Sequence, residues 1–357
     1  MNSDILIIGG GVAGLSAAAA LAPLGQVRLF EAEGSLGHHA SSRSAALYEP
    51  RYGNPAVVAL SLASGDFYHG SGLLSDRGFM CLDGAAHRER FLRHVKDFEL
   101  EELSLNEALE LFPILNPDTI AFAAHARHAW DIDTDALLQR YSRCARAAGA
   151  DIRTRARVSG LRRQGGHWQV TEAGEVFTAP LLVNAAGAWA DEVAVMAGVK
   201  PIGLQALRRS MARIPAPAGH DVRAWPMVIG GAEDWYMKPD AGALIVSPAE
   251  EDPMPPHDAF ADDMVLAEGL ARFEEAVTTP VTRLLANWAG LRTFAHDRVP
   301  VIGFDTTTPG FFWLAGQGGY GFQTAPAAAA LVAELVAARP PGLEKAVAEA
   351  LSPARFG

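Results

Sequence analysis

The feature that most constrains the fold of this chain is the glycine cluster GGGVAG at residues 9–14. It follows the apolar run DILII and precedes an Ala/Leu-rich stretch, typical of a helix, that reaches about Ala22. Residues 26–30 then have the composition of a second strand. This order predicts a strand–helix–strand unit with parallel strands. At the start of the helix, the G-x-G-x-x-G spacing permits a tight turn and lets the backbone approach a pyrophosphate.

A carboxylate at the end of the second predicted strand strengthens the dinucleotide interpretation. Glu31 lies 17 residues after Gly14. There its side chain can accept hydrogen bonds from ribose hydroxyls, and it would repel a 2′-phosphate. The alternative is that the glycines only let the helix pack closely on the strand, and this context disfavours it.

A second glycine cluster, GQGGYGFQT at residues 316–324, follows a predicted strand and opens a predicted helix over roughly 319–338. An NAD enzyme usually needs nothing there for its dinucleotide, whereas a permanently held flavin needs protein around its ring. Backbone N–H groups and the positive end of a helix at this turn would face the flavin pyrimidine. The two clusters together therefore predict FAD, with one glycine turn at the diphosphate and the other at the ring.

The segment between the clusters predicts the rest of the architecture. After Gly149, three runs have the pattern of successive antiparallel strands, and residues 200–250 contain alternating segments that suit an antiparallel sheet with one face toward a ligand. The predicted fold class is α/β, a Rossmann-like FAD-binding domain with a discontinuous, mainly antiparallel-sheet substrate domain. The FAD-binding domain is assigned to residues 1–50, 131–200 and 285–357, and the substrate domain to 51–130 and 201–284.

Composition excludes several classes of function. The net charge is −11 and no clustered Lys/Arg face is present, which argues against nucleic-acid binding. Only Cys81 and Cys144 occur, so we expect a reducing, cytoplasmic location, with peripheral contact to the inner membrane left open. Glycines and Pro23 interrupt the N-terminal apolar stretch, so no transmembrane segment is expected. The histidine pairs lack a supporting ligand set, so no metal is expected.

With these motifs in place, the chain resembles the D-amino-acid oxidase superfamily of FAD enzymes. It is most similar to the bacterial FAD-dependent D-amino-acid dehydrogenases of the D-arginine dehydrogenase type. The resemblance spans nearly the whole chain and rests on the segments GGGVAGLSAA, SSRSAALYEPRYG, DIDTDAL, LVNAAGAWAD, RRS, DWYMKPDAG, SPAEEDP, WAGLRTF and GFFWLAGQGGYGFQT.

The resemblance implies that a D-amino acid, a small-molecule substrate, is oxidised to the imino acid by hydride transfer from Cα to flavin N5. Water then yields the 2-oxo acid and ammonia. Two alternatives stay open. One is an amine oxidase or dehydrogenase of the glycine/sarcosine or proline type in the same superfamily, and the other is a non-enzymatic, FAD-containing assembly factor. The electron acceptor, a quinone or oxygen, is also open.

Five substrate-site residues follow from the resemblance. Arg292 is expected to bind the substrate carboxylate, because a planar guanidinium holds a carboxylate through two hydrogen bonds. Arg209 would assist it, unless Arg209 only pairs with neighbouring acids. Tyr52 and Tyr236 would line the cavity, with Tyr236 bonding the carboxylate, and Gly319 belongs to the turn that orients the substrate.

The cofactor contacts implied by the resemblance and by the glycine motifs form a longer set. In it, a serine and arginine loop would cover the diphosphate, unless Arg43 is merely a surface arginine. The predicted set is Gly9, Gly11, Val12, Ala13, Gly14, Glu31, Ala32, Ser42, Arg43, Ser44, Ala46, Leu47, Val158, Ala186, Gly187, Trp189, Gly290, Gly318, Gly319, Tyr320, Gly321 and Gln323.

Two positions depart from the relatives that act on basic substrates. Leu47 stands where those relatives have a histidine, and Phe79 stands roughly where they have the glutamate that pairs with a cationic side chain. An aromatic ring removes that counter-charge and fills space. We therefore expect an apolar or medium-sized substrate side chain, with Phe79, Met227 and Ile229 as walls.

Overall fold

The predicted strand–helix–strand unit lies at the centre of a mostly parallel sheet in the computed structural model, which describes residues 2–357. β1 pairs with β2 on one side and with β13 on the other, all in parallel, as expected from the sequence. Only β20 joins its neighbour antiparallel. The six strands, in sheet order, are β20 (Val301–Phe304), β21 (Phe311–Ala315), β13 (Leu181–Asn184), β1 (Ile5–Ile8), β2 (Val27–Phe30) and β9 (Asp151–Arg153).

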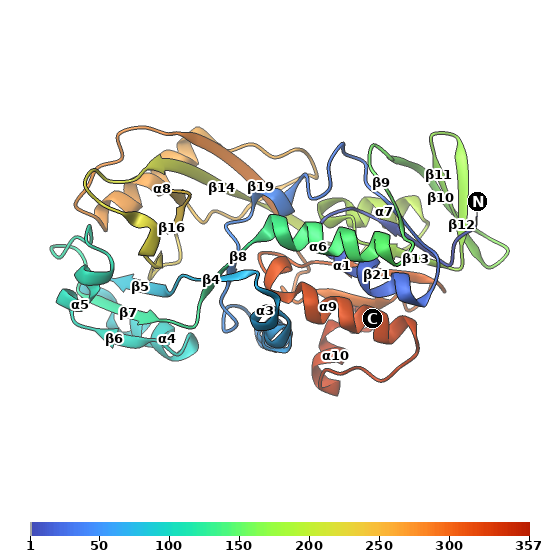
Figure 1. The fold of residues 1–357 in the computed structure, drawn as a ribbon, viewed down its shortest axis with the longest axis horizontal. Coiled ribbons are helices and arrows are strands. Elements are labelled where there is room, and N and C mark those ends of the chain that lie inside the picture. Colours follow the sequence, from blue (N-terminus) through green and yellow to red (C-terminus); the bar gives the residue numbers. More distant parts are fainter. Residues whose placement is uncertain (1) are drawn as a thin grey trace.

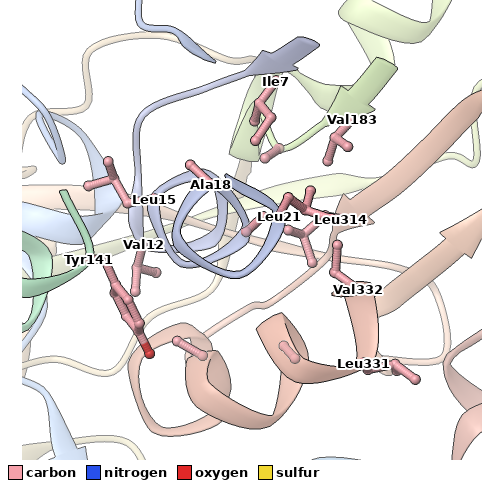
Figure 2. Packing of buried hydrophobic residues seen from close by; sticks show 14 of the residues in the cluster. Ile7, Val12, Leu15, Ala18, Leu21, Tyr141, Val183, Leu314, Leu331 and Val332 are labelled. Atoms are coloured by element: carbon pink, nitrogen blue, oxygen red, sulfur yellow. The ribbon is translucent and has the colours of Figure 1, made fainter. Parts of the chain in front are cut away.

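Helix α1 (Val12–Leu21) is packed on several sides, because its alanines let other elements approach closely. It contacts α6 (Thr134–Ala147) and α9 (Gly321–Val336). Figure 2 shows Leu21 of α1 among residues of the sheet and of α9, including Leu314 and Val332. These side chains are fully or almost fully buried. The core therefore fixes the start of α1 against the carboxyl ends of β1 and β13.

A larger, mainly antiparallel sheet forms the other half of the molecule (Figure 1). Its one parallel pair joins β15 to β5. Side chains alternate between its faces: Met80, Val228 and Met237 enter a core beneath α8, whereas Phe79 and Ile229 face the opposite side. Its strands are β18 (Asp252–Met254), β14 (Gln205–Pro215), β17 (Ala243–Ser247), β16 (Tyr236–Asp240), β15 (Met227–Gly230), β5 (Phe79–Asp83), β7 (Phe122–Ala126), β6 (Glu101–Leu103) and β19 (Ala286–Phe294).

Two small sheets complete the strand inventory. The three predicted antiparallel strands after Gly149 are present and form a separate sheet at one end of the molecule (Figure 1). A second small sheet joins the two halves. The members are β10 (Val158–Gln164), β11 (His167–Glu172) and β12 (Glu175–Ala179) in the first, and β3 (Leu47–Tyr48), β8 (Trp130–Ile132) and β4 (Leu74–Asp76) in the second.

Two stretches that have a helical pattern in the sequence are divided in the structure. Residues 54–70 form two helices separated at Ser64, and residues 89–112 contain β6 between two helices. Within residues 2–357, no helix is both long and apolar enough to span a membrane. The remaining helices are α2 (Pro55–Ala63), α3 (Gly65–Ser71), α4 (Arg88–Asp97), α5 (Leu105–Leu111), α7 (Ala190–Met196), α8 (Asp263–Glu275) and α10 (Lys345–Leu351).

The domain ranges stay a prediction. In the structure, two groups of residues pair or pack with elements from the other predicted domain. β19 lies within the range assigned to the FAD-binding domain, yet it pairs along its whole length with β14 of the larger sheet. Conversely, Leu60 and Tyr68, from the range assigned to the substrate domain, are buried in the core around α1. The two halves are therefore interlocked through these elements.

Candidate active site

Two elongated cavities of about 230 Å³ each lie between the two sheets. They share walls, including Gly11, Ser41, Arg43 and Gly187, and so form one continuous trough. The first cavity reaches the larger sheet, and the second extends along the carboxyl ends of β1 and β2. A trough of this shape suits a long dinucleotide with a substrate at one end.

The first glycine turn lies at the middle of the trough. Gly9 has φ +105°, and a Cβ there would lie 2.3 Å from the carbonyl oxygen of Ala185. A Cβ on Gly14 would lie 1.9 Å from the carbonyl oxygen of Gly9. Ser41 accepts a hydrogen bond from the Val12 amide at 3.0 Å. The turn thus requires glycine at both positions, because a Cβ at either one would collide with the backbone. The amino end of α1 is directed at the trough.

Glu31 lines the second cavity. Its two carboxylate oxygens accept hydrogen bonds from the Gly10 amide at 2.7 Å and the Glu33 amide at 2.8 Å. Val158 and Trp189 line the same cavity. The carboxylate is thereby fixed in orientation, and ribose binding by Glu31 stays a prediction.

The serine and arginine loop is tied to the protein itself. Arg43 donates through Nη1 to the carbonyl oxygens of Ala259 and Ala289, at 2.8 and 2.9 Å, and pairs through Nη2 with Asp258. Ser42 donates to the backbone of His38. Arg43 still lines both cavities, but its guanidinium anchors the loop to β19, which agrees better with a structural role than with a free phosphate ligand.

The second glycine turn meets the first across the trough. A Cβ on Gly321 would lie 3.3 Å from Cγ1 of Val12. Helix α9 begins beside it without a side-chain cap, so its first N–H groups are not satisfied by a capping residue. The amino ends of α1 and α9 therefore converge on one cavity, which agrees with the expectation that each holds a different part of one cofactor.

The predicted substrate arginines are neighbours on one face of the larger sheet. Arg209 pairs in register with Gly290, and Leu207 pairs with Arg292, so the two arginines are diagonal neighbours on β14 and β19. Both line the first cavity. A Cβ on Gly319 would lie 1.7 Å from Nη2 of Arg292. The glycine therefore makes room for the guanidinium beside the second turn.

The two tyrosines complete what we name the carboxylate end, formed by Arg209, Arg292, Tyr52 and Tyr236. Among residues 2–357, the one acceptor of the Tyr236 hydroxyl is the sulfur of Met211, at 3.4 Å, and sulfur is a weak acceptor. Burial lowers the pKa of Arg292, but Tyr52 and Tyr236 raise it, and the net shift is upward. Burial and the neighbouring Arg292 lower the pKa of Arg209.

Glu251 balances part of this positive charge. It accepts hydrogen bonds from Arg298 at 2.8 and 3.0 Å and from Arg209 at 3.3 Å, and it lies 3.9 Å from Arg292. Three guanidinium groups thus share one carboxylate. The remaining positive charge favours an anion in the cavity, and the acid-pairing alternative for Arg209 holds alongside its place in the site.

The opposite side of the first cavity is apolar, as expected. Phe79, Met227, Ile229 and Leu47 line it. The sequence interpretation missed Glu49, a residue that lines this cavity and is only 2% exposed. Its place two residues after Leu47, directly after β3, was the available signal.

Of the predicted site residues, all five assigned to the substrate line the first cavity. Most of the predicted cofactor residues line one or both cavities. The exceptions among the described residues are Gly14, Ser42 and Tyr320. Gly14 packs against the backbone of Gly9 within the turn. Tyr320 is buried between Tyr52 and Phe294.

The structure brings together one cluster of possible metal ligands that the sequence interpretation did not predict. Glu33 lies beside His38 and His39, and their possible ligand atoms are within 4.8 Å of one another. His39 also contacts the Trp189 ring, with 4.5 Å between ring centroids. The predicted absence of a metal stays a prediction.

Comparisons with known proteins agree with this geometry. Residues 4–335 match the DAO family of FAD dependent oxidoreductases. A glycine oxidase of Pseudomonas aeruginosa is 28% identical over 383 aligned positions, covering 97% of this chain and 98% of that protein. A glycine oxidase structure from Geobacillus kaustophilus has a TM-score of 0.82 at 22% identity, covering 97% and 98% of the two chains. An L-proline dehydrogenase from P. horikoshii reaches 0.84 at 23% identity, covering 99% and 98%.

The two structural likenesses show the shared α/β fold. The predicted superfamily is confirmed, whereas similarity to the D-amino-acid dehydrogenases in particular stays a prediction. The glycine turns, the converging helix ends and the length of the trough fit FAD. The chain belongs to the DAO family of FAD dependent oxidoreductases.

Proposed function

We propose that this protein oxidises an amino acid at the C–N bond next to its carboxylate. The relatives support a reaction of the glycine, sarcosine or proline type more than the D-amino-acid dehydrogenase reaction that the sequence resemblance favoured. The observation that carries the proposal is the pair of arginines, buried Arg209 and half-buried Arg292, beside the second glycine turn. A monocarboxylate is the anion that such a pair would hold.

The chain's own residues supply orientation. Arg292 and Arg209 would bind the substrate carboxylate, and Tyr236 would donate to it. FAD, when bound, supplies the two-electron oxidant. The apolar wall excludes water from the reacting carbon. Such orientation can lower a barrier by about 7 to 11 kcal/mol. The products are an imino acid, then a carbonyl compound and an amine after hydrolysis.

Anaerobic mixing with a panel of amino acids tests the proposal. The panel includes glycine, sarcosine, and both enantiomers of proline and of larger amino acids, and loss of the oxidised-flavin absorbance is followed. We expect at least one member to bleach the flavin. Oxygen added afterwards distinguishes an oxidase from a dehydrogenase. A holoprotein that no amine reduces would contradict the proposal and favour the non-enzymatic alternative.

Arg292→Lys provides the matched test of the carboxylate end. Lysine keeps the charge but loses the planar pair of donors, and a hydrogen bond to a charged group contributes about 1.5–3 kcal/mol, so we expect kcat/KM for flavin reduction to fall about 10-fold or more. Arg213→Gln is the control, because Arg213 lies on β14, the strand paired with β19, but it pairs with Asp240 and lines neither cavity. Equal losses in the two variants would argue against a substrate contact by Arg292.

A further inference from the structure

Glu49 has a carboxyl oxygen for which the protein provides no hydrogen-bond donor. Its Oε1 accepts a hydrogen bond from the Arg51 amide at 2.9 Å. Its Oε2 is buried and has no hydrogen-bond partner among residues 2–357. Nε2 of His128 lies 3.8 Å from this oxygen and is itself 3.1 Å from the carbonyl oxygen of Phe98. Such an acid is costly to bury unless something else completes its hydrogen bonds.

The charges around Glu49 do not neutralise it. Burial raises the pKa of Glu49 to about 7, the Arg51 amide and guanidinium lower it, and Glu99 raises it. The Arg51 guanidinium pairs with Glu99 at 2.8 Å, which diverts it from Glu49. At neutral pH the carboxyl therefore has capacity for a donor, and a cation is favoured.

Glu49 and the carboxylate end line the same cavity from different elements. Glu49 directly follows β3, whereas Arg209 and Arg292 lie on β14 and β19. A ligand whose carboxylate is held by the two arginines would meet Glu49 through another group. The apolar wall would contact the stem of such a ligand.

We propose that Glu49 determines substrate specificity by accepting a hydrogen bond from a donor, preferably an amine, at the end of the substrate's side chain. This inference rests on the proposed function. It replaces the expectation of an apolar substrate side chain, which followed from Phe79 standing where relatives have an acid. In this proposal Glu49, in the segment after β3, takes the place of the acid that relatives have at the position of Phe79.

A pair of ligands that lack an α-amine tests the contact without requiring oxidation. Hexanoate and 6-aminohexanoate differ in the terminal amine, and calorimetry on the holoprotein at about pH 8 measures their binding. A hydrogen bond to a charged group contributes about 1.5–3 kcal/mol, so we expect 6-aminohexanoate to bind about 10- to 100-fold more tightly. Equal affinities for the wild type would overturn the proposal.

Three variants test whether Glu49 is the residue responsible for the preference for 6-aminohexanoate. Glu49→Leu should remove the preference for 6-aminohexanoate, and the isosteric Glu49→Gln should reduce it. Glu110→Gln is the control, because Glu110 is an exposed acid that lines neither cavity and does not act on Glu49, and this variant should retain the preference. Each preference is a ratio measured on one preparation, so partial unfolding cancels. A preference that survives in Glu49→Leu would overturn the assignment.

Flavin reduction by lysine and norleucine, both enantiomers of each, separates this inference from the proposed function. If both bleach the flavin equally well in the wild type and in Glu49→Leu, the role of Glu49 is wrong and amine oxidation stands. If no panel amino acid bleaches the flavin, while 6-aminohexanoate keeps its Glu49-dependent advantage, the proposed function fails and donor recognition by Glu49 stands.

Discussion

The family resemblance, together with the fit of a guanidinium to a carboxylate, pointed to Arg292 and Arg209 as single residues of the site. The structure places both in one cavity. Arg43 fitted a phosphate equally well from the sequence, but three carbonyl and carboxylate oxygens engage it. Glu49 was missed because its importance comes from burial and from absent partners. Neither property is visible in the segment LYEPRYG.

The same burial makes Glu49 a pH-dependent cost to stability. The pKa of its carboxyl is about 7 in the folded protein and near 4.5 when unfolded. Its contribution is fully present below about pH 4.5 and is lost as the pH rises through 7. Between pH 5 and pH 8 we expect Glu49→Gln to gain roughly 2–3 kcal/mol in unfolding free energy relative to wild type.

Urea unfolding of both proteins at the two pH values measures this difference. Arg51, Glu99 and His128 face the carboxyl and are present in both proteins, so their own titration largely cancels. Glu110→Gln is the control and should show a much smaller change, because Glu110 is an exposed residue that does not act on Glu49. A difference between wild type and Glu49→Gln that does not vary with pH would show that the carboxyl titrates normally.

At the scale of elements, the two glycine turns were the most predictable parts, because backbone approach leaves few residue types that fit. Helix limits were less predictable. The apolar pattern of 54–70 continues through Ser64, yet that hydroxyl donates to Leu60 and accepts from Ala327 of α9. A tertiary contact thus helps to set where α2 ends, and a local pattern does not contain it.

The turn before α1 gives a sharp prediction. In Gly14→Ala the new Cβ would lie 1.9 Å from the Gly9 carbonyl oxygen, and neither backbone segment can move without opening the turn. We expect the purified variant to lose most of its flavin, measured as the ratio of flavin to protein absorbance. Gly70→Ala is the control, because nothing lies within 4 Å of its Cβ, and it should keep a full complement. Full flavin content in Gly14→Ala would contradict the proposed role of the turn.

For the whole molecule, the sequence predicted that the two chain ends meet at one cofactor, and the contact of Gly321 with Val12 agrees with this. It did not predict that β19 enters the larger sheet. The run ANWAGLRTF has an ordinary strand pattern, and its partner β14 lies some 80 residues earlier. Long-range pairing of this kind depends on the assembled sheet, so the domain limits could not be derived from local signals.

This arrangement predicts which backbone amides are protected from hydrogen exchange by ADP and which by FAD. If the cofactor residues are assigned correctly, ADP would occupy the second cavity and the first glycine turn, whereas only FAD would reach residues 316–324. We therefore expect ADP to slow amide hydrogen exchange at residues 9–14 of the apoprotein, and FAD to slow it at both turns. The β10–β12 sheet serves as an internal control, since it should change little with either ligand. If ADP alone protected residues 316–324 as fully as FAD does, the second turn would not be the ring site. Protection there by FAD alone would require the flavin to bridge both ends of the chain.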